Sequence, residues 1–309
     1  MSTSFGIAVP NTYMGDGVGE EHFGEYAQTV ERLGFQSAWV LERTLHPERP
    51  MLETMTLLGY LAAKTRSVRI GSSVILFPLR NPLIFAKAAA TLDYLSRGRL
   101  TLGIALGSMK AEYEASGIPW ERRLKRFNSG LGVMKALWTG ELVNYEGEIG
   151  RIQAGRQLPT PVQKPHPKLL FGGSADGVLR RAAKNADGWI GGGGLDPAAF
   201  KEHVVRLKTY LAANDRTPEQ FEIVKLIHIH VENDEDRAKA ILTGELLRYY
   251  GRPFDVEARS AYGRPETCAQ RLRTLIEAGA RHFVLVPVVP DLEQPARISA
   301  EILPALVQR

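Results

Sequence analysis

Strand-like and helix-like segments alternate along the whole chain, and this alternation constrains the fold more than any other feature of the sequence. Eight short apolar runs are typical of strands buried on both faces, because they lack the strict alternation of a strand with one solvated face. Amphipathic segments of helical periodicity lie between them, from Glu20–Leu33 near the start to Pro295–Val307 at the end. The expected strands are Phe5–Val9, Gln36–Leu41, Val68–Phe77, Leu100–Leu106, Lys168–Phe171, Gly188–Ile190, Phe221–Val231 and Phe283–Val289.

Eight strands that each lead into a helix predict an α/β fold of the (β/α)8 TIM-barrel type, formed by residues 1–309 as a single domain. The alternative is a doubly wound sheet, which is disfavoured because no GxGxxG loop follows the first strand. Residues 109–167 interrupt the alternation with one helix, Leu124–Trp138, and a long stretch rich in Gly and Pro. We predict that they form an insertion after strand 4 that acts as a lid over the ligand site.

Composition excludes several classes of partner. The 39 basic residues outnumber the 34 acidic ones by only five and form no basic patch interleaved with aromatics, so we expect no nucleic-acid partner. No apolar run approaches the roughly 18 residues of a membrane span, and the first residues do not resemble a secretory signal. The single cysteine, Cys268, cannot form an internal disulfide and fits a reducing compartment. We therefore expect a cytoplasmic protein without a membrane partner.

Small residues follow two of the expected strands at the end where ligands bind in α/β folds. Gly107 and Ser108 follow the fourth strand, and Gly172, Gly173 and Ser174 follow the fifth, just before a helix. Free N–H groups at a helix N-terminus together with a hydroxyl can bind a phosphate. A plain turn is the alternative interpretation of these glycines.

The third strand contains small residues in its interior, at Gly71 to Val74. Small residues at such a position indicate a bulge or the close approach of a ligand to the backbone, here at Ser73 and Val74. A narrow layer of the barrel that needs small side chains would explain them equally well.

Three ionisable residues are candidates for catalysis. His228 and His230 alternate along the seventh strand and so share one face, where a histidine near the barrel mouth could donate or accept a proton close to neutral pH. Glu42 ends the second strand beside Arg43 and is the carboxylate expected to tune such a histidine. The alternatives are an outward histidine pair packed under a helix and an ion pair that closes the strand. We expect no metal site, because the sequence has no HExxH helix and no acidic residues at ligand spacing.

Five segments, in this order and spacing, resemble the luciferase-like oxidoreductases that bind FMN or the deazaflavin coenzyme F420. The segments are GSSVILFPLRNP (71–82), AKAAATLDYLSRGRLTLGIALGS (86–108), ALWTGE (136–141), PTPVQKPHPKLLFGGS (159–174) and LRRAAKNADGW (179–189). The resemblance implies a barrel whose third-strand bulge, often with a non-prolyl cis peptide, supports the flavin ring at Ser73-Val74. It also implies that the cofactor phosphate lies near Gly107-Ser108 and Gly172–Ser174.

Two positions depart from the family pattern. Glu42 matches the family, but Arg43 replaces the histidine that often follows it, and Leu106 stands where many members carry an arginine for the phosphate. The resemblance implies an enzyme that uses reduced FMN and oxygen to oxidise a small organic substrate. The alternative within the family is F420-dependent hydride transfer. The alternatives outside it are a non-redox sugar-phosphate barrel enzyme and a flavin-binding protein without turnover. A separate flavin or F420 reductase and a homodimer are the further partners that the resemblance implies.

Overall fold

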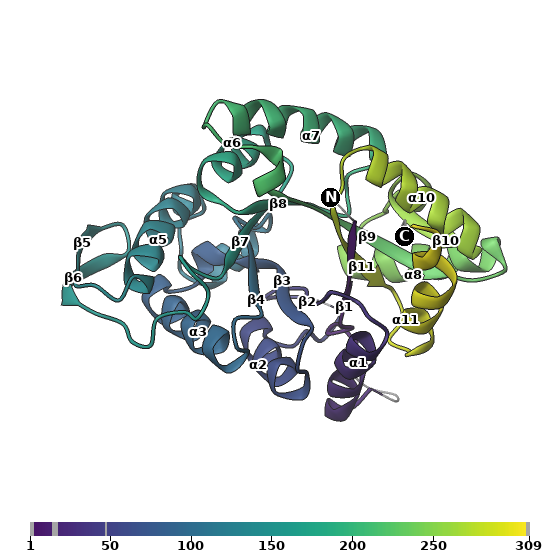
Figure 1. Cartoon of the computed structure of the whole chain (residues 1–309), viewed down its shortest axis with the longest axis horizontal. Coiled ribbons are helices and arrows are strands. Elements are labelled where there is room, and N and C mark those ends of the chain that lie inside the picture. The colour runs from purple at the N-terminus through teal and green to yellow at the C-terminus, as the bar shows by residue number, and fades with distance from the viewer. Residues whose placement is uncertain (1–2, 14–17, 47, 307–309) are drawn as a thin grey trace.

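The computed structural model describes residues 3–13, 18–46 and 48–306, and within these ranges eight parallel strands close into a barrel (Figure 1). The strands follow one another around the barrel in chain order, and the last one pairs with the first. The barrel prediction is therefore confirmed. The barrel strands are β1 (Ser4–Ala8), β2 (Ser37–Val40), β3 (Arg69–Leu76), β4 (Leu100–Ala105), β7 (Lys168–Gly172), β8 (Gly188–Gly191), β9 (Glu222–Val231) and β11 (His282–Pro287).

Helices surround this barrel, and several begin where the sequence provides a cap. Asn81 accepts the N–H groups of Leu83 and Ile84 ahead of a proline at the first helical position. The last predicted helix, Pro295–Val307, instead divides into the short pieces Glu293–Arg297, Ile298–Ile302 and Leu303–Ala305, and Val307 lies outside the described residues. Pro304, which cannot donate a backbone hydrogen bond, lies in the last of these pieces. The helices around the barrel are α1 (Glu20–Arg32), α2 (Thr54–Lys64), α3 (Pro82–Leu95), α6 (Asp176–Asn185), α7 (Pro197–Ala212), α8 (Glu235–Tyr250), α9 (Val256–Arg259), α10 (Pro265–Glu277) and α11 (Glu293–Arg297).

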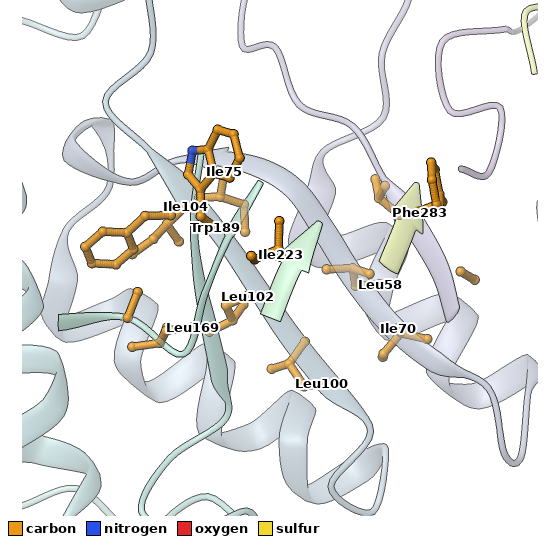
Figure 2. Close-up of a cluster of buried hydrophobic side chains, with 14 of the residues drawn as sticks. Leu58, Ile70, Ile75, Leu100, Leu102, Ile104, Leu169, Trp189, Ile223 and Phe283 are labelled. Carbon is orange, nitrogen blue, oxygen red and sulfur yellow. The ribbon is translucent and has the colours of Figure 1, made fainter. Parts of the chain in front are cut away.

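The core has two layers separated by the barrel wall. Side chains such as Ile70, Leu100 and Ile104 point outward and pack beneath the helices, as Figure 2 illustrates. A smaller cluster, which includes Leu226, fills the barrel interior. Because side chains alternate along a strand, Leu226 inside the barrel places His228 on the same inner side. Among the described residues, no helix is both long enough and apolar enough to cross a bilayer.

One additional strand, β10 (Ser260–Gly263), was not expected from the sequence. It pairs with His228–Val231 of β9, whereas β8 pairs with the first part of that strand, Glu222–Lys225. The segment has no apolar run, so its extended conformation comes from the partner strand rather than from its own pattern. The carboxyl half of β9 thus pairs with β10, whereas its first half pairs with β8.

The insertion between β4 and β7 contains α4 (Lys110–Ala115), α5 (Arg123–Trp138) and a hairpin of β5 (Val143–Gly147) with β6 (Gly150–Gly155). The predicted helix over Leu124–Trp138 is present as α5, which packs against α3. The hairpin was not predicted, and it projects away from the barrel beyond α5 (Figure 1).

Candidate functional site

A cavity of about 580 Å³ opens at the carboxyl ends of the strands. All the residues predicted to contact a cofactor line it, together with Glu42 and His228, whereas His230 is not among its lining residues. The predicted cofactor residues along this cavity are Ser73, Val74, Gly107, Ser108, Gly172, Gly173 and Ser174. Segments far apart in the sequence therefore meet at one concave surface.

A second and larger cavity, of about 780 Å³, lies at the amino ends of the strands. Several of its polar groups bond to one another: Lys168 pairs with Glu222, and the His282 ring bonds to the hydroxyls of Ser4 and Ser37. Catalytic residues of (β/α)8 barrels lie at the opposite, carboxyl face. We therefore take the 580 Å³ cavity, called the upper cavity from here on, as the candidate site.

The floor of the upper cavity is the bulge in β3. The pairing of β3 with β4 shifts register between Ser72 and Ile75, and the Ser73–Val74 peptide bond is cis. The bulge thus lies where the resemblance places it. Ser73 Oγ is buried and has no hydrogen-bond partner among the described residues. A buried hydroxyl without a partner is destabilising, so a ligand that supplied one would be favoured here.

The loop after β7 packs directly against this bulge. A Cβ atom on Gly172 would lie 2.8 Å from Val74 Cγ1, closer than side chains tolerate. Gly173 has φ +131°, a backbone conformation that favours glycine. Helix α6 begins just beyond, and no side chain caps its first N–H groups. This loop leaves backbone donors available at the wall of the cavity.

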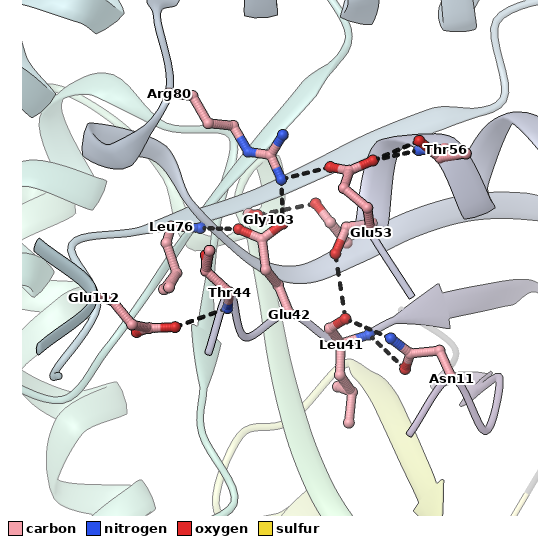
Figure 3. A network of polar contacts seen from close by, with 12 residues as sticks. Asn11, Leu41, Glu42, Thr44, Glu53, Thr56, Leu76, Arg80, Gly103 and Glu112 are labelled. Atoms are coloured by element: carbon pink, nitrogen blue, oxygen red, sulfur yellow. Dashed lines mark hydrogen bonds and ion pairs between the residues drawn. The ribbon is translucent and has the colours of Figure 1, made fainter. Parts of the chain in front are cut away.

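Glu42 braces the end of β3 (Figure 3). Its carboxylate accepts the N–H of Leu76 at 2.7 Å and forms an ion pair with Arg80, which also contacts Glu53. The described contacts of Glu42 do not include His228. The ion pair that the sequence offered as an alternative is present, and a catalytic role for Glu42 stays a prediction.

His228 is buried at the wall of the upper cavity, with Nε2 3.0 Å from the Tyr250 hydroxyl. Burial lowers the pKa of His228 to about 3, and the positive charge of Lys225 lowers it further. His228 is therefore neutral near pH 7, in contrast to the expectation that it changes protonation there. It can still donate or accept a hydrogen bond.

We expect the fold to lose stability as the pH falls from 6.5 towards 5. Burial depresses the pKa of His228 to about 3 and that of His282 to about 4. The unfolded chain, in which histidine titrates near 6.5, then takes up protons that the native state cannot. Each histidine should cost on the order of 1 kcal/mol per pH unit. Urea unfolding at pH 7, 6 and 5 measures this loss, and H282N should reduce the slope. An unfolding free energy that stays constant over this range would contradict the prediction.

Sequence reasoning missed several residues that line the upper cavity. Arg123 begins α5, and its guanidinium carbon lies 3.8 Å from the centroid of the Trp120 ring, which lines the upper cavity with it. Tyr249 and Tyr250 enter from the end of α8. The sequence does show an arginine at the start of one predicted helix and a tyrosine pair at the end of another. Only the tertiary fold shows that these side chains reach the cavity.

The two parts of the insertion lie in different places relative to the upper cavity. Met109, Glu112, Trp120 and Arg123 line it. None of the residues 140–167 does, and Gln163–His166 line the 780 Å³ cavity at the amino ends of the strands instead. Any lid over the site would therefore be residues 109–123.

The profile of the luciferase-like monooxygenase family matches residues 3–254, most of the chain. This chain belongs to that family. The first curated relatives, uncharacterised mycobacterial proteins, are 37% identical over 160 residues, and the match spans only about half (54%) of their length. An F420-dependent glucose-6-phosphate dehydrogenase of Microbacterium testaceum is 26% identical over 94% of this chain and 96% of its own.

Solved structures share the fold. An F420-dependent secondary alcohol dehydrogenase in complex with an F420–acetone adduct superposes with a TM-score of 0.87 at 21% identity over 100% of both chains. The oxygenating constituent of 3,6-diketocamphane monooxygenase from Pseudomonas putida, in complex with FMN, gives 0.80 at 17% identity, again over 100% of both chains. In the described ranges, no group of three or more His, Cys, Asp or Glu side chains is placed to hold a metal ion.

Proposed function

We propose that this chain is an oxidoreductase that binds reduced FMN in the upper cavity and oxidises a small organic substrate with oxygen. The observation that carries the proposal is the convergence of three separate chain segments on this one cavity, where Ser73 Oγ lacks a partner among the described residues. Membership of the luciferase-like family supports the same conclusion.

The residues present fit a flavin. In our proposal the ring lies against Ser73 and Val74, where the orphaned hydroxyl of Ser73 gains an acceptor or donor. The phosphate lies at Gly172–Ser174 and Ser108, and Arg123 takes the role of the arginine that is missing at Leu106. Bound FMN supplies electrons for the activation of oxygen, whereas F420 supplies a hydride. The protein positions the substrate and excludes water from the reacting atoms.

F420-dependent hydride transfer is the second candidate function. It is supported by the relative from Microbacterium testaceum, whose match extends over nearly the whole length of both chains. The fold neighbour with bound F420–acetone adduct is consistent with this candidate. We also propose that a separate reductase supplies the reduced cofactor. We propose further that the protein forms a homodimer and is located in the cytoplasm.

A titration with FMN, reduced FMN and F420, followed by absorbance and protein fluorescence, tests the proposed function. We expect saturable binding of one of the three. Binding of none of them, together with tight binding of a sugar phosphate, would instead support the non-redox barrel enzyme. Binding without any substrate-dependent oxidation of the reduced cofactor would favour a flavin-binding protein without turnover.

A further inference from the structure

Arg43 presents a cation to the upper cavity that the described residues leave without a counter-ion. It follows β2, is half-buried and lines the cavity wall. One N–H group contacts Met109 Sδ at 3.0 Å, a weak acceptor. The guanidinium carbon lies 5.4 Å from the centroid of the Tyr249 ring. No carboxylate of the described chain lies within 4.0 Å of it, although a half-buried arginine is usually paired.

The nearby acidic groups are engaged elsewhere. Glu42 is held by Leu76 and Arg80. Glu112 Oε1 accepts the backbone N–H groups of Thr44 and Leu45, at 2.7 and 3.2 Å. Both carboxylates therefore hold the loops around Arg43 in place, and neither forms an ion pair with it in the described chain. The guanidinium is left with Met109 and Tyr249 as its contacts, and a bound anion would give it a charged partner.

Arg43 follows a strand on the other side of the β3 bulge from the strands that lead into the proposed phosphate loops. β2 pairs with one edge of β3, whereas β4, and then β7, lie on the other side. The glycine loops that would hold the phosphate follow β4 and β7. Arg43 thus follows the strand on the opposite side of the bulge from these loops, although its guanidinium reaches Met109, the residue after Ser108. The effect of Arg43→Gln on cofactor affinity therefore distinguishes a carboxylate ligand from the cofactor phosphate.

The wall beside Arg43 is apolar and aromatic. Tyr249, Tyr250 and Leu226 line this side of the cavity, and His228 lies among them in a neutral state. Burial raises the pKa of Tyr249, and the positive charge of Arg43 opposes that rise, as expected if the two groups are close. A compact ligand with a planar anion at one end and an apolar body at the other would complement this surface.

We propose that Arg43 is a specificity-determining residue that binds the carboxylate of an organic-acid substrate, whose apolar body packs against Tyr249 and Tyr250. This proposal rests on the proposed function for the identity of the cofactor, but the anion site itself can be tested separately.

The test compares benzoate with benzamide, its uncharged analogue, by calorimetric titration of the protein with and without the bound cofactor. We expect benzoate to bind at least tenfold more tightly than benzamide. Arg43→Gln should abolish this preference, and Arg43→Lys, which keeps the charge but loses the planar fork, should retain part of it. Lys110→Gln is the matched control, because it removes a positive charge close by but outside the cavity lining. It should leave the preference unchanged.

Two results would overturn the proposal. One is equal binding of benzoate to the wild type and to a folded Arg43→Gln variant. The other is a loss of cofactor affinity in that variant with the benzoate preference intact, since Arg43 would then serve the cofactor. If the wild type binds neither FMN nor F420 but still prefers benzoate through Arg43, the proposed function fails and the anion site stands.

Discussion

Replacing Gly173 with valine is expected to weaken cofactor binding by more than tenfold, about 1.4 kcal/mol. Gly173 has φ +131°, which side-chain-bearing residues rarely adopt, and an added Cβ would lie 3.3 Å from Val178 Cγ2. The loop must therefore shift, and the backbone at Ser174 and at the start of α6 shifts with it. Because the proposed phosphate contacts are backbone donors of this loop, their geometry is lost.

Gly194→Val provides the matched control for this experiment. Gly194 lies in the loop after β8 and does not line the upper cavity, and a Cβ atom added to it would meet no described atom within 4 Å. This control should keep the wild-type affinity in the same fluorescence titration. Thermal unfolding shows whether each variant is folded. An unchanged affinity in folded Gly173→Val would remove the phosphate from this loop.

The barrel could be predicted because its strands carry their own signal. Buried on both faces, they read as short apolar runs, and caps such as Asn81-Pro82 fix the helix starts. The segments that were missed carry no such signal. β10 is extended only because the end of β9 offers it a partner, and the β5–β6 hairpin is mostly exposed, so its sequence needs no apolar pattern.

The candidate site was predictable where backbone geometry requires small residues. Gly172 and Gly173 could be predicted as site residues because the backbone there requires glycine. Side chains that reach the cavity from elsewhere gave no local signal: Arg123 comes from the insertion and Tyr250 from the end of α8. The protonation of His228 also depends on burial and on Lys225, which only the tertiary structure reveals.

Replacing His228 with asparagine is expected to reduce turnover by about 10- to 100-fold while cofactor affinity stays nearly unchanged. His228 lines the upper cavity on the β9 side, away from the proposed phosphate loops. In our proposal its neutral ring forms a hydrogen bond to the substrate, and the loss of such a bond in a buried site costs about 1–3 kcal/mol. Single-turnover oxidation of the bound reduced cofactor in the presence of substrate measures the effect.

His230→Asn is the matched control, because His230 lies two residues further along the same strand face but does not line the cavity. It should keep nearly full turnover.

Since the pKa of His228 is lowered to about 3, any limb of the pH–rate profile near neutrality should persist in His228→Asn. Tyr250→Phe should cause a smaller loss, because the Tyr250 hydroxyl contacts Nε2 and so helps to fix the tautomer of His228. Full activity of His228→Asn would leave His228 a structural residue, and loss of the neutral limb would make it the titrating group despite its burial.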